Sequence, residues 1–318
     1  MWRTALPSHE RRECLSGTRP LAGDGARSAS CFTLFAFRHL CHNSRVYLEF
    51  YGLRQAPFDL TPNPHFLFHS GKHREALNHL LYGVRERKGF VQLTGEIGAG
   101  KTTLCRALLE QLDRRFATAL ILNPPLDADE LMRTVAREFG LPIGSLQLDR
   151  LEALALLSEF LLRQRSEGRE SVLIIDEAQN LSEELLEQVR LLSNIETNES
   201  KLLQIVLLGQ PELRDRLNSP RLRQLRQRIT VRYHLAPLTR REIAQYIQHR
   251  LTLAGAQGAP YFTAPALWRI WLYSGGIPRL INAVCDKALL AGYVERSDRI
   301  TSRMVARAIR ELRGNIHA

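Results

Sequence analysis

The chain has 318 residues, of which 44% are hydrophobic and 24% charged, as is typical of a globular protein that buries a substantial core. No apolar run approaches the ~18–20 residues that a membrane-spanning helix requires, so no transmembrane segment is predicted. The net charge of +11 comes almost entirely from arginine and is compatible with anionic partners such as nucleotides, nucleic acids or lipid headgroups. The five cysteines lack CxxC or metal-like spacing, which favours reduced thiols in a cytosolic compartment over a disulfide framework.

Residues 1–45 have the composition of a loop or a disordered segment, with three of the five cysteines, scattered arginines and the stretch SGTRPLAGDGARSAS. The apolar stretch SASCFTLFAF is similar to the core of a signal peptide. However, Arg38, His39 and His42 follow it in place of a small-residue cleavage site. We therefore expect residues 1–45 to be an N-terminal extension that is either disordered or not part of the native protein.

From Lys88 onward, short apolar segments alternate with helical patterns. Five segments are predicted to be strands: Phe90–Thr94, Thr118–Leu122, Ser171–Asp176, Gln204–Gly209 and Ile229–Leu235. Helices are predicted at about residues 100–115, 127–139 and 149–164, and after Ser182, which suits a helix N-cap. In the helix at 149–164, one face is expected to carry Leu151, Leu154, Leu157 and Leu161. This alternation predicts a parallel sheet covered on both faces, and we interpret residues 90–237 as an α/β domain.

After Pro237 no further strand is predicted. Four amphipathic helical patterns follow instead: REIAQYIQHRLTLAG, APALWRIWLYSGG, IPRLINAVCDKALLAGY and TSRMVARAIRELRG. We interpret residues 238–314 as a small all-helical domain.

The stretch GEIGAGKT (Gly95–Thr102) satisfies the G-x-x-x-x-G-K-[ST] pattern of a phosphate-binding loop and lies between a predicted strand and a predicted helix, as the pattern requires. Its glycines let the backbone curl so that successive N–H groups point at a β-phosphate. Lys101 is expected to reach the β and γ oxygens, and the Thr102 hydroxyl to bind Mg²⁺. The residues expected to bind ATP are Gly95, Gly98, Ala99, Gly100, Lys101, Thr102, Thr103 and Asp176.

The segment VLIIDE (Val172–Glu177) is an apolar strand that ends in two acids. Asp176, at the carboxyl end of the strand, is placed to hold Mg²⁺ through its water shell. Glu177 is placed to polarise the attacking water. The sequence therefore predicts hydrolysis of ATP to ADP and phosphate, with Mg²⁺ bound by Thr102 and Asp176.

Two further residues narrow the class of protein. Gln210 directly follows the fourth predicted strand, where its side chain could sense the γ-phosphate. In the helical domain, GGIPRLIN (Gly275–Asn282) begins a helix with Arg279 in its first turn. An α/β nucleotide core followed by a four-helix lid with an arginine at a helix N-terminus is the plan of the AAA+ ATPases. The predicted fold is therefore an AAA+ P-loop NTPase with a five-stranded parallel sheet and a small all-helical lid domain.

The segment RDRLNSPRLRQLRQRI, before the fifth strand, contains the arginines Arg214, Arg216, Arg221, Arg223, Arg226 and Arg228. One interpretation is an arginine finger that reaches the γ-phosphate bound by a neighbouring subunit. Arg228 is the first candidate for this role in trans, with Arg226 and Arg223 as alternatives. The other interpretations are a patch for DNA phosphates and a solvated basic helix.

A set of motifs covers residues 46–312: VYLEFYGLRQAPF, NPHFLF, HREALNHLLYGVRERKGFVQLTGEIGAGKTTL, LIIDEAQNL, LLGQPELR, QRI…YHLAPL and GGIPRLIN. Together they resemble the general secretion pathway protein A group, the ExeA-like AAA+ ATPases. The resemblance implies that residues 46–89 form a leader that packs against the nucleotide core. It also implies nucleotide-dependent homo-oligomers with ATP and Mg²⁺ as cofactors.

Members of that group serve type II secretion, related pilus systems and polysaccharide export. Full-length secretion members continue past the lid into a membrane span and a peptidoglycan-binding domain, which this sequence lacks up to Ala318. The resemblance thus implies a cytoplasmic ATPase, peripheral at the inner membrane, with a separately encoded inner-membrane partner of a secretion, pilus or polysaccharide system. The leader commonly begins the protein in this group, and a GUG start codon inside a longer frame would read as Val46. We therefore hypothesise that synthesis begins at Val46.

The competing interpretation is a DNA-associated AAA+ ATPase, because transposition target selectors share this core and the excess of arginine is compatible with nucleic acid. The YGL-x-x-x-PF leader favours the secretion-type group. A third interpretation is a nucleotide-dependent scaffold with little turnover.

Overall fold

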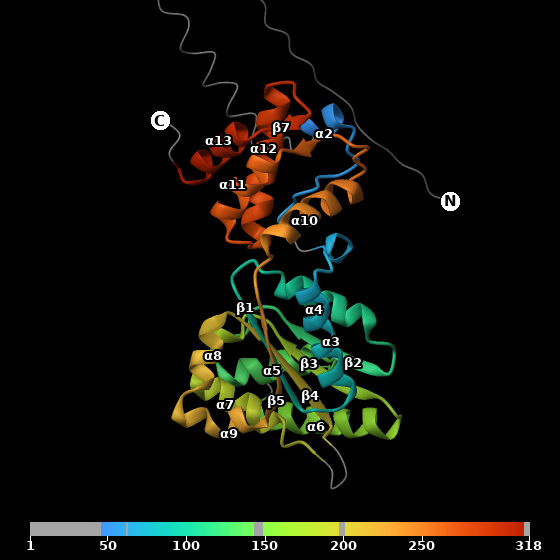
Figure 1. Ribbon diagram of the computed structural model, residues 1–318. Helices are drawn as coiled ribbons and strands as arrows, with labels where there is room; N and C mark the ends of the chain where they lie inside the picture. The colour runs from blue at the N-terminus through green and yellow to red at the C-terminus, as the bar shows by residue number, and fades with distance from the viewer. Residues whose placement is uncertain (1–45, 62, 143–148, 197–200, 315–318) are drawn as a thin grey trace, which may run out of the picture. The chain divides into compact units, whose positions relative to one another are not determined.

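The computed structural model describes residues 46–61, 63–142, 149–196 and 201–314 (Figure 1). The expectation for residues 1–45 lies outside the described residues. The start of synthesis at Val46 stays a hypothesis. None of the helices in the described ranges is long and apolar enough to cross a bilayer.

A five-stranded parallel sheet forms the centre of the described chain up to residue 237. Its strands are β1 (Phe90–Gly95), β2 (Phe116–Ile121), β3 (Glu170–Ile175), β4 (Leu203–Gly209) and β5 (Ile229–Leu235), in the order β2-β3-β4-β1-β5. Every neighbouring pair is parallel. The β1, β3 and β4 strands are almost wholly buried, as expected of apolar runs in a sheet with two covered faces. The predicted parallel sheet is confirmed, with strand ends shifted by one or two residues.

Alternate residues of each strand enter one of two hydrophobic clusters, because successive side chains point to opposite faces. On one face, Val91 and Leu93 pack against α3 (Gly71–Arg85) and α4 (Lys101–Gln111). On the other face, Phe90 joins a larger cluster with the remaining helices between β1 and residue 237. These are α5 (Ala128–Glu138), α6 (Arg150–Ser166), α7 (Glu183–Leu192), α8 (Pro211–Leu217) and α9 (Arg223–Arg228).

The buried face of α6 differs from the expected one. Leu157 and Leu161 are buried, but the Leu151 side chain is 72% exposed. Six residues separate Leu151 from Leu157, which at about 100° per residue turns Leu151 some 120° away from the buried stripe. Phe160 instead packs beside Leu157 and Leu161, so the prediction that Leu151 shares their face is wrong.

The described chain after residue 237 is mainly helical and has a hydrophobic cluster of its own, which residues of the leader also enter. It contains the four predicted helices: α10 (Arg240–Leu253), α11 (Ala264–Ser274), α12 (Pro278–Val294) and α13 (Ser302–Leu312). A short parallel pair, β6 (Tyr261–Phe262) and β7 (Arg299–Ile300), joins the loops before α11 and α13. The expectation that strands stop after Pro237 is therefore wrong at this point, where two-residue strands give no periodic signal.

The aromatic leader packs on the helical domain, and the prediction that it packs against the nucleotide core is wrong for this part. Helix α2 (Val46–Tyr51) lies beside α12 (Figure 1). The Tyr47 hydroxyl donates to Asp286 Oδ1 at 2.5 Å, and the Tyr51 hydroxyl donates to the Leu289 carbonyl at 3.2 Å. Both rings are buried in the helical cluster, because α12 offers apolar surface together with partners for the hydroxyl groups. In contrast, the later leader helix α3 packs on the sheet.

Candidate functional site

The phosphate loop (Gly95–Thr102) connects the buried end of β1 to the first turn of α4. Gly98 and Gly100 have φ values of +79° and +101°, in the left-handed region that glycine adopts without a Cβ penalty. A Cβ at Gly98 would lie 2.4 Å from the Arg279 Cβ, so glycine is also required for the close approach of α12. The loop geometry thus needs glycine at both positions, of which the sequence pattern specifies only Gly100.

The Lys101 side chain is buried within this loop. Its Nζ donates to the carbonyl oxygens of Gly95 at 2.8 Å and Glu96 at 3.1 Å. Burial lowers the pKa of the Lys101 ammonium, an effect that the nearby carboxylates of Glu177 and Asp176 oppose. The Lys101 ammonium, held by backbone carbonyls at the base of the loop, is available to an incoming anion. The anion would accept the same N–H hydrogen bonds that these carbonyls accept.

The two predicted Mg²⁺ ligands meet at the carboxyl edge of the sheet. The Thr102 hydroxyl donates to Asp176 Oδ2 at 2.6 Å, and the Glu177 backbone N–H donates to Asp176 Oδ1 at 2.9 Å. Asp176 is buried, and this burial raises the pKa of its carboxyl group. A hydroxyl and a carboxylate are hard oxygen donors, so the pair fits a Mg²⁺ ion that keeps several water ligands.

Glu177 is held by two glutamines. Its Oε2 accepts from Gln179 Nε2 at 2.5 Å and from Gln210 Nε2 at 3.2 Å, while the Gln210 backbone N–H donates to Gln179 Oε1 at 3.0 Å. The backbone of Glu177 is left-handed, with φ 51° and ψ 36°, which is uncommon for a residue with a side chain. The structure therefore joins Glu177 and Gln210, the two residues placed here from the sequence, both directly and through a third residue, Gln179. Gln179 was missed because no periodic pattern marks a single buried polar residue after a strand.

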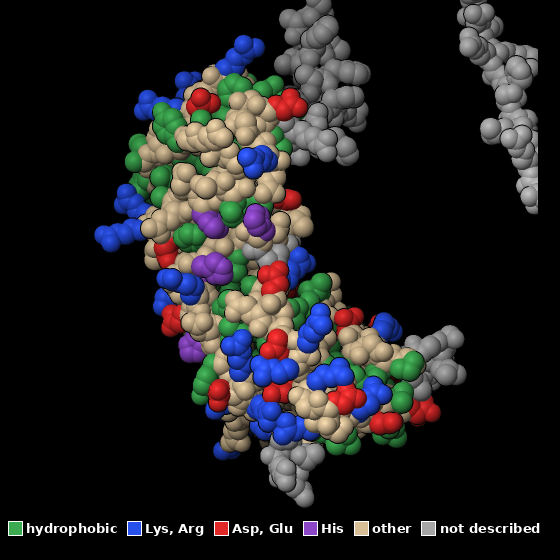
Figure 2. Space-filling model, turned by 90° about the vertical axis from the view of Figure 1, so that its right-hand side faces the viewer, with side chains coloured by type: hydrophobic (Ala, Val, Ile, Leu, Met, Phe, Trp, Pro, Cys, Tyr) green, Lys and Arg blue, Asp and Glu red, His purple; other side chains and the backbone are tan. Residues whose placement is uncertain are grey.

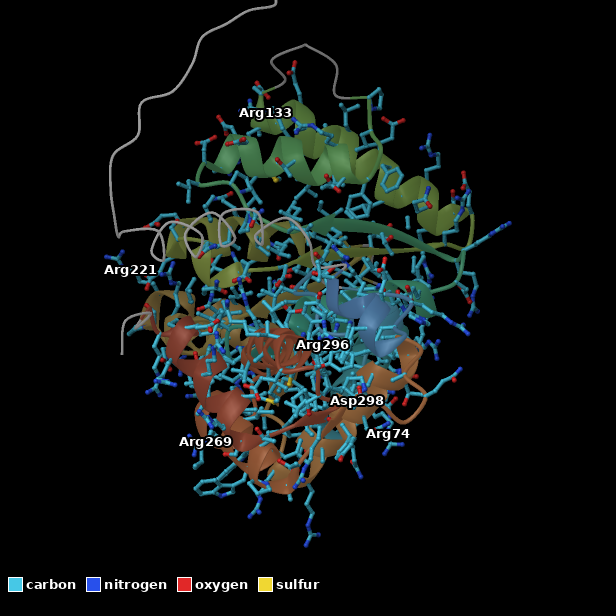
Figure 3. All side chains as sticks on the ribbon, turned by 90° about the horizontal axis from the view of Figure 1, so that it is seen from above. Arg74, Arg133, Arg221, Arg269, Arg296 and Asp298 are labelled. Atoms are coloured by element: carbon cyan, nitrogen blue, oxygen red, sulfur yellow. The ribbon has the colours of Figure 1, made fainter. Side chains whose placement is uncertain are left out.

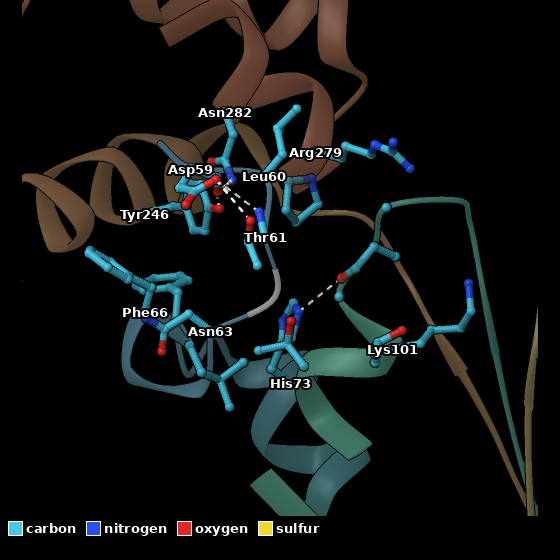
Figure 4. Close-up of a pocket in the computed structure, with 18 of the residues that line it drawn as sticks. Asp59, Leu60, Thr61, Asn63, Phe66, His73, Lys101, Tyr246, Arg279 and Asn282 are labelled. Carbon is cyan, nitrogen blue, oxygen red and sulfur yellow. Dashed lines mark hydrogen bonds between the residues drawn. The ribbon is translucent and has the colours of Figure 1, made fainter. Parts of the chain in front are cut away.

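A cavity of about 350 Å³ opens over the phosphate loop (Figure 4). The loop contributes residues 97–103, including Ala99 and Thr103, and Glu177 lies at its border. The helical domain contributes Arg279, an exposed residue in the first turn of α12, whose backbone N–H donates to the Gly98 carbonyl at 3.2 Å. Gly95, which ends β1, is not among the residues that line this cavity.

The leader forms another wall of the cavity. The sequence did not predict the buried polar residues that hold the leader there. Arg250 of α10 is buried, and its guanidinium donates to the Pro57 carbonyl at 2.5 Å and to the Tyr246 hydroxyl at 2.8 Å. The Tyr246 hydroxyl in turn donates to Asn282 Oδ1 at 2.8 Å. The Arg250 guanidinium also lies 4.8 Å from the centroid of the Phe66 ring. This network fixes the leader beside the cavity, and its partners are far apart in the sequence.

The arginine-rich segment divides into several environments. Arg228 is half-buried, and its Nη1 donates to Ser193 Oγ of the same chain at 2.6 Å; Arg216 donates to the Leu181 carbonyl. Arg221 projects away from the ribbon (Figure 3), and Arg223 is exposed. A second cavity, of about 270 Å³, is lined by residues that include Arg214, Arg226, Arg232 and His234. The six arginines therefore do not form one surface.

Comparison with known proteins identifies the class of fold and domain in this chain. Residues 84–217 match the family described as AAA domain. The fold is similar to that of Cdc6p from Pyrobaculum aerophilum, with a TM-score of 0.59 and 21% identity, covering 75% of this chain and 66% of the other. It is also similar to a chain of the Drosophila ORC bound to DNA, with a TM-score of 0.60 and 16% identity, covering 94% and 70%. The chain thus has the AAA+ fold and contains an AAA domain, as predicted.

One relative is similar to this chain in sequence as well as in class. The chain is 46% identical to the general secretion pathway protein A of Aeromonas hydrophila over 273 residues, which are 85% of this chain and 49% of the relative. The resemblance stated from the motifs is confirmed by this similarity. The chain spans about half the length of that relative, and the AAA domain supports ATPase activity at the level of the class.

Proposed function

We propose that the protein binds ATP with Mg²⁺ and hydrolyses it to ADP and phosphate. The observation that carries this proposal is the 2.6 Å bond between Thr102 and Asp176, beside a phosphate loop with a buried Lys101. The backbone N–H groups of residues 98–102 and Lys101 would bind the β- and γ-phosphates. Thr102 and Asp176 would hold Mg²⁺, which supplies neutralisation of the phosphate charge when it is bound. Gly95, Gly98, Ala99, Gly100 and Thr103 complete the proposed nucleotide site.

In the proposed reaction, Glu177 orients the attacking water and accepts its proton. The water oxygen forms a bond with the γ-phosphorus, while the bond from the γ-phosphorus to the β–γ bridging oxygen breaks and leaves its electrons on ADP. The two hydrogen bonds from Gln179 and Gln210 keep the Glu177 carboxylate in place for this step. Gln210 would respond to the γ-phosphate through the same carboxylate, and Arg279 would contact the phosphates from the helical domain.

A catalytic arginine from a second copy would complete the site. Arg228 is our first choice in trans, with Arg226 and Arg223 as alternatives. Arg228 would have to exchange its bond to Ser193 for a phosphate oxygen, whereas Arg223 is already exposed. This proposal predicts nucleotide-dependent homo-oligomers, because an arginine in trans acts only when two copies meet. Phosphate release that rises more than linearly with protein concentration would support it.

Replacement of Glu177 by glutamine tests the hydrolytic proposal. We expect Glu177→Gln to bind ATP as tightly as the wild type but to release phosphate at least a hundredfold more slowly, because an amide cannot accept the proton. Glu184→Gln, an exposed acid in the first turn of α7, is the matched control and should leave both quantities unchanged. Unchanged phosphate release in Glu177→Gln would overturn the assigned role. If the wild-type protein binds ATP but does not hydrolyse it, the interpretation as a nucleotide-dependent scaffold is favoured instead.

We further infer that this ATPase is an oligomeric motor or regulator of an envelope system: type II secretion, a pilus or an exopolysaccharide locus. The support is the 46% identity to a general secretion pathway protein. An inner-membrane partner is proposed, and the protein would act in the cytoplasm at the surface of that membrane. Deletion of the gene, complemented with wild type or Lys101→Ala, tests this. Loss of secreted protein, pili or polysaccharide that only the wild type restores supports the proposal, and normal levels of all three would exclude it.

A DNA-associated ATPase is the second candidate, and the second cavity favours it. Arg214, Arg226, Arg232 and His234 line this cavity, and no acid is among its described lining residues. However, Figure 2 shows that the Lys and Arg side chains of one face are interspersed with Asp and Glu rather than gathered in a stripe. A mobility-shift titration at stepped salt decides between the two. ATP-dependent duplex binding that falls by several orders of magnitude from 50 to 200 mM salt would favour DNA.

A further inference from the structure

His73, in the first turn of α3, contacts the phosphate loop from the leader. The side chain is 4% exposed. Its Nδ1 lies 2.8 Å from Ser70 Oγ, and its Nε2 lies 3.2 Å from the carbonyl oxygen of Ala99, a contact that Figure 4 marks with a dashed line. His73 also lines the nucleotide cavity, although α3 precedes the sheet and the sequence pattern assigns it no chemistry.

The chemistry of the two partners fixes the proton on the ring. A carbonyl oxygen only accepts, so Nε2 must carry the hydrogen and donate to Ala99. Ser70 Oγ already accepts from the His73 backbone N–H at 3.2 Å, and its own hydroxyl hydrogen can then be donated to Nδ1. The neutral ring therefore satisfies every contact. Burial lowers the pKa of His73, which agrees with a neutral ring, while the bond to Ala99 opposes this shift.

The Ala99 carbonyl belongs to the same planar peptide unit as the Gly100 N–H. In a trans peptide these two groups point in opposite directions, so a bond that holds the carbonyl also directs the N–H. Gly100 has a left-handed backbone and forms the N-cap of α4, where N–H groups bind anions. A Cβ at Gly100 would lie 3.4 Å from His73 Nε2, which shows how closely the ring approaches the loop.

We propose that His73 is a positioning residue that holds the Ala99–Gly100 peptide with its N–H directed toward the bound phosphates. This inference rests on the proposed binding of ATP in the same loop. The leader helix α3 thereby takes part in the nucleotide site, although the matched AAA domain begins only at residue 84. His73 does not touch the reacting atoms, so its effect belongs to nucleotide affinity rather than to the rate at saturation.

Two amide substitutions separate the two bonds of the ring. In His73→Gln the amide nitrogen reaches the place of Nε2 and retains the donor to Ala99, whereas in His73→Asn the amide reaches only Ser70. We expect His73→Gln to keep the Kd for ATP within about threefold and His73→Asn to raise it by about tenfold, as expected for one lost hydrogen bond. The rate at saturating ATP should change little in both. His79→Asn, on the same helix outside the cavity, is the control.

Hydrogen exchange of the Gly100 amide in the ADP-bound full chain provides a readout independent of activity. It should be faster in His73→Asn than in wild type and unchanged in His73→Gln. Equal ATP affinity in the two variants, or equal exchange at Gly100, would overturn the proposal. Lys101→Ala distinguishes the proposals: if it binds ATP like the wild type, the proposed function fails. If it loses ATP while His73→Asn does not, only the role of His73 fails.

Discussion

Thr102 and Asp176 lie 74 residues apart in the chain, yet the Thr102 hydroxyl donates a 2.6 Å hydrogen bond to Asp176 Oδ2. We predict that Thr102→Ala lowers the apparent affinity for Mg²⁺ in ATP hydrolysis by about 10- to 100-fold, because one proposed oxygen ligand and the hydrogen-bond partner of Asp176 are lost together. A Mg²⁺ titration of phosphate release measures this. Thr102→Ser keeps the hydroxyl and should stay close to wild type; a serine variant as weak as the alanine variant contradicts the assignment.

Gln179 is predicted to affect the rate of hydrolysis and not the affinity for ATP. Gln179→Met has a similar length but can neither donate to Glu177 Oε2 nor accept from the Gln210 backbone N–H. We expect the rate at saturating ATP to fall about tenfold and the Kd to change less than twofold, because one bond to a charged group is lost. Single-turnover kinetics and ATP titration measure the two quantities. Gln245→Met, exposed on α10, should change neither, and a reduced ATP affinity in Gln179→Met would count against this role.

Gly98→Ala should disrupt the contact between the phosphate loop and α12. The new Cβ would lie 2.4 Å from the Arg279 Cβ and would also hold a left-handed backbone at a cost of about 1–2 kcal/mol. We therefore expect the Kd for ATP to rise tenfold or more. Gly140→Ala has a comparable φ of +75° but no atom within 4 Å of its Cβ, so it controls for backbone strain alone. An equal effect of both variants on ATP binding would remove the steric argument.

The leader is predicted to stabilise the helical domain. Tyr47→Phe removes the donor to Asp286 Oδ1 while keeping the ring, and we expect a loss of about 1.5–3 kcal/mol in the free energy of unfolding. Chemical denaturation monitored by circular dichroism measures this loss. Tyr82→Phe is the matched control, because the Tyr82 ring is 52% exposed. A Tyr47→Phe variant as stable as the control would show that the buried bond does not contribute.

Stability should fall on acidification, partly because of His73. Its pKa is lowered in the folded state, so the unfolded chain takes up a proton near its ordinary value of about 6.5 while the folded protein resists it. The contribution is therefore complete above about pH 6.5 and is lost as the pH falls below that value. His73→Gln cannot titrate and should show a flatter dependence between pH 7 and 5.5. Parallel curves for the variant and the wild type would contradict this prediction.

The sequence predicted the sheet, the helical domain and the nucleotide loop because each depends on local pattern. Apolar runs such as VLIID indicate buried strands, and the spacing of glycine, lysine and threonine around Lys101 identifies the phosphate loop. The docking of the leader was not predictable in this way. The hydrogen bonds from Tyr47 and Tyr51 to α12 span 239 and 238 positions of the sequence, respectively. No periodicity in the sequence connects such distant partners.

The same limit explains the missed residues of the site. His73, Gln179 and Arg250 are buried polar residues whose meaning comes from a partner elsewhere in the chain. In the sequence each is one polar residue in or beside an element, and such residues are usually solvated. The partner of Arg228 was missed for this reason too, because Ser193 lies at the end of α7, 35 residues before it.

The left-handed backbone of Glu177 has a consequence for selection experiments. A non-glycine residue in this conformation costs about 1–2 kcal/mol, so Glu177→Gly would relieve that strain but would also lose the hydrogen bonds from Gln179 and Gln210 and the proposed proton acceptor. A library screened for heat resistance alone would therefore select on backbone strain and on these two bonds, and not on the proposed hydrolysis.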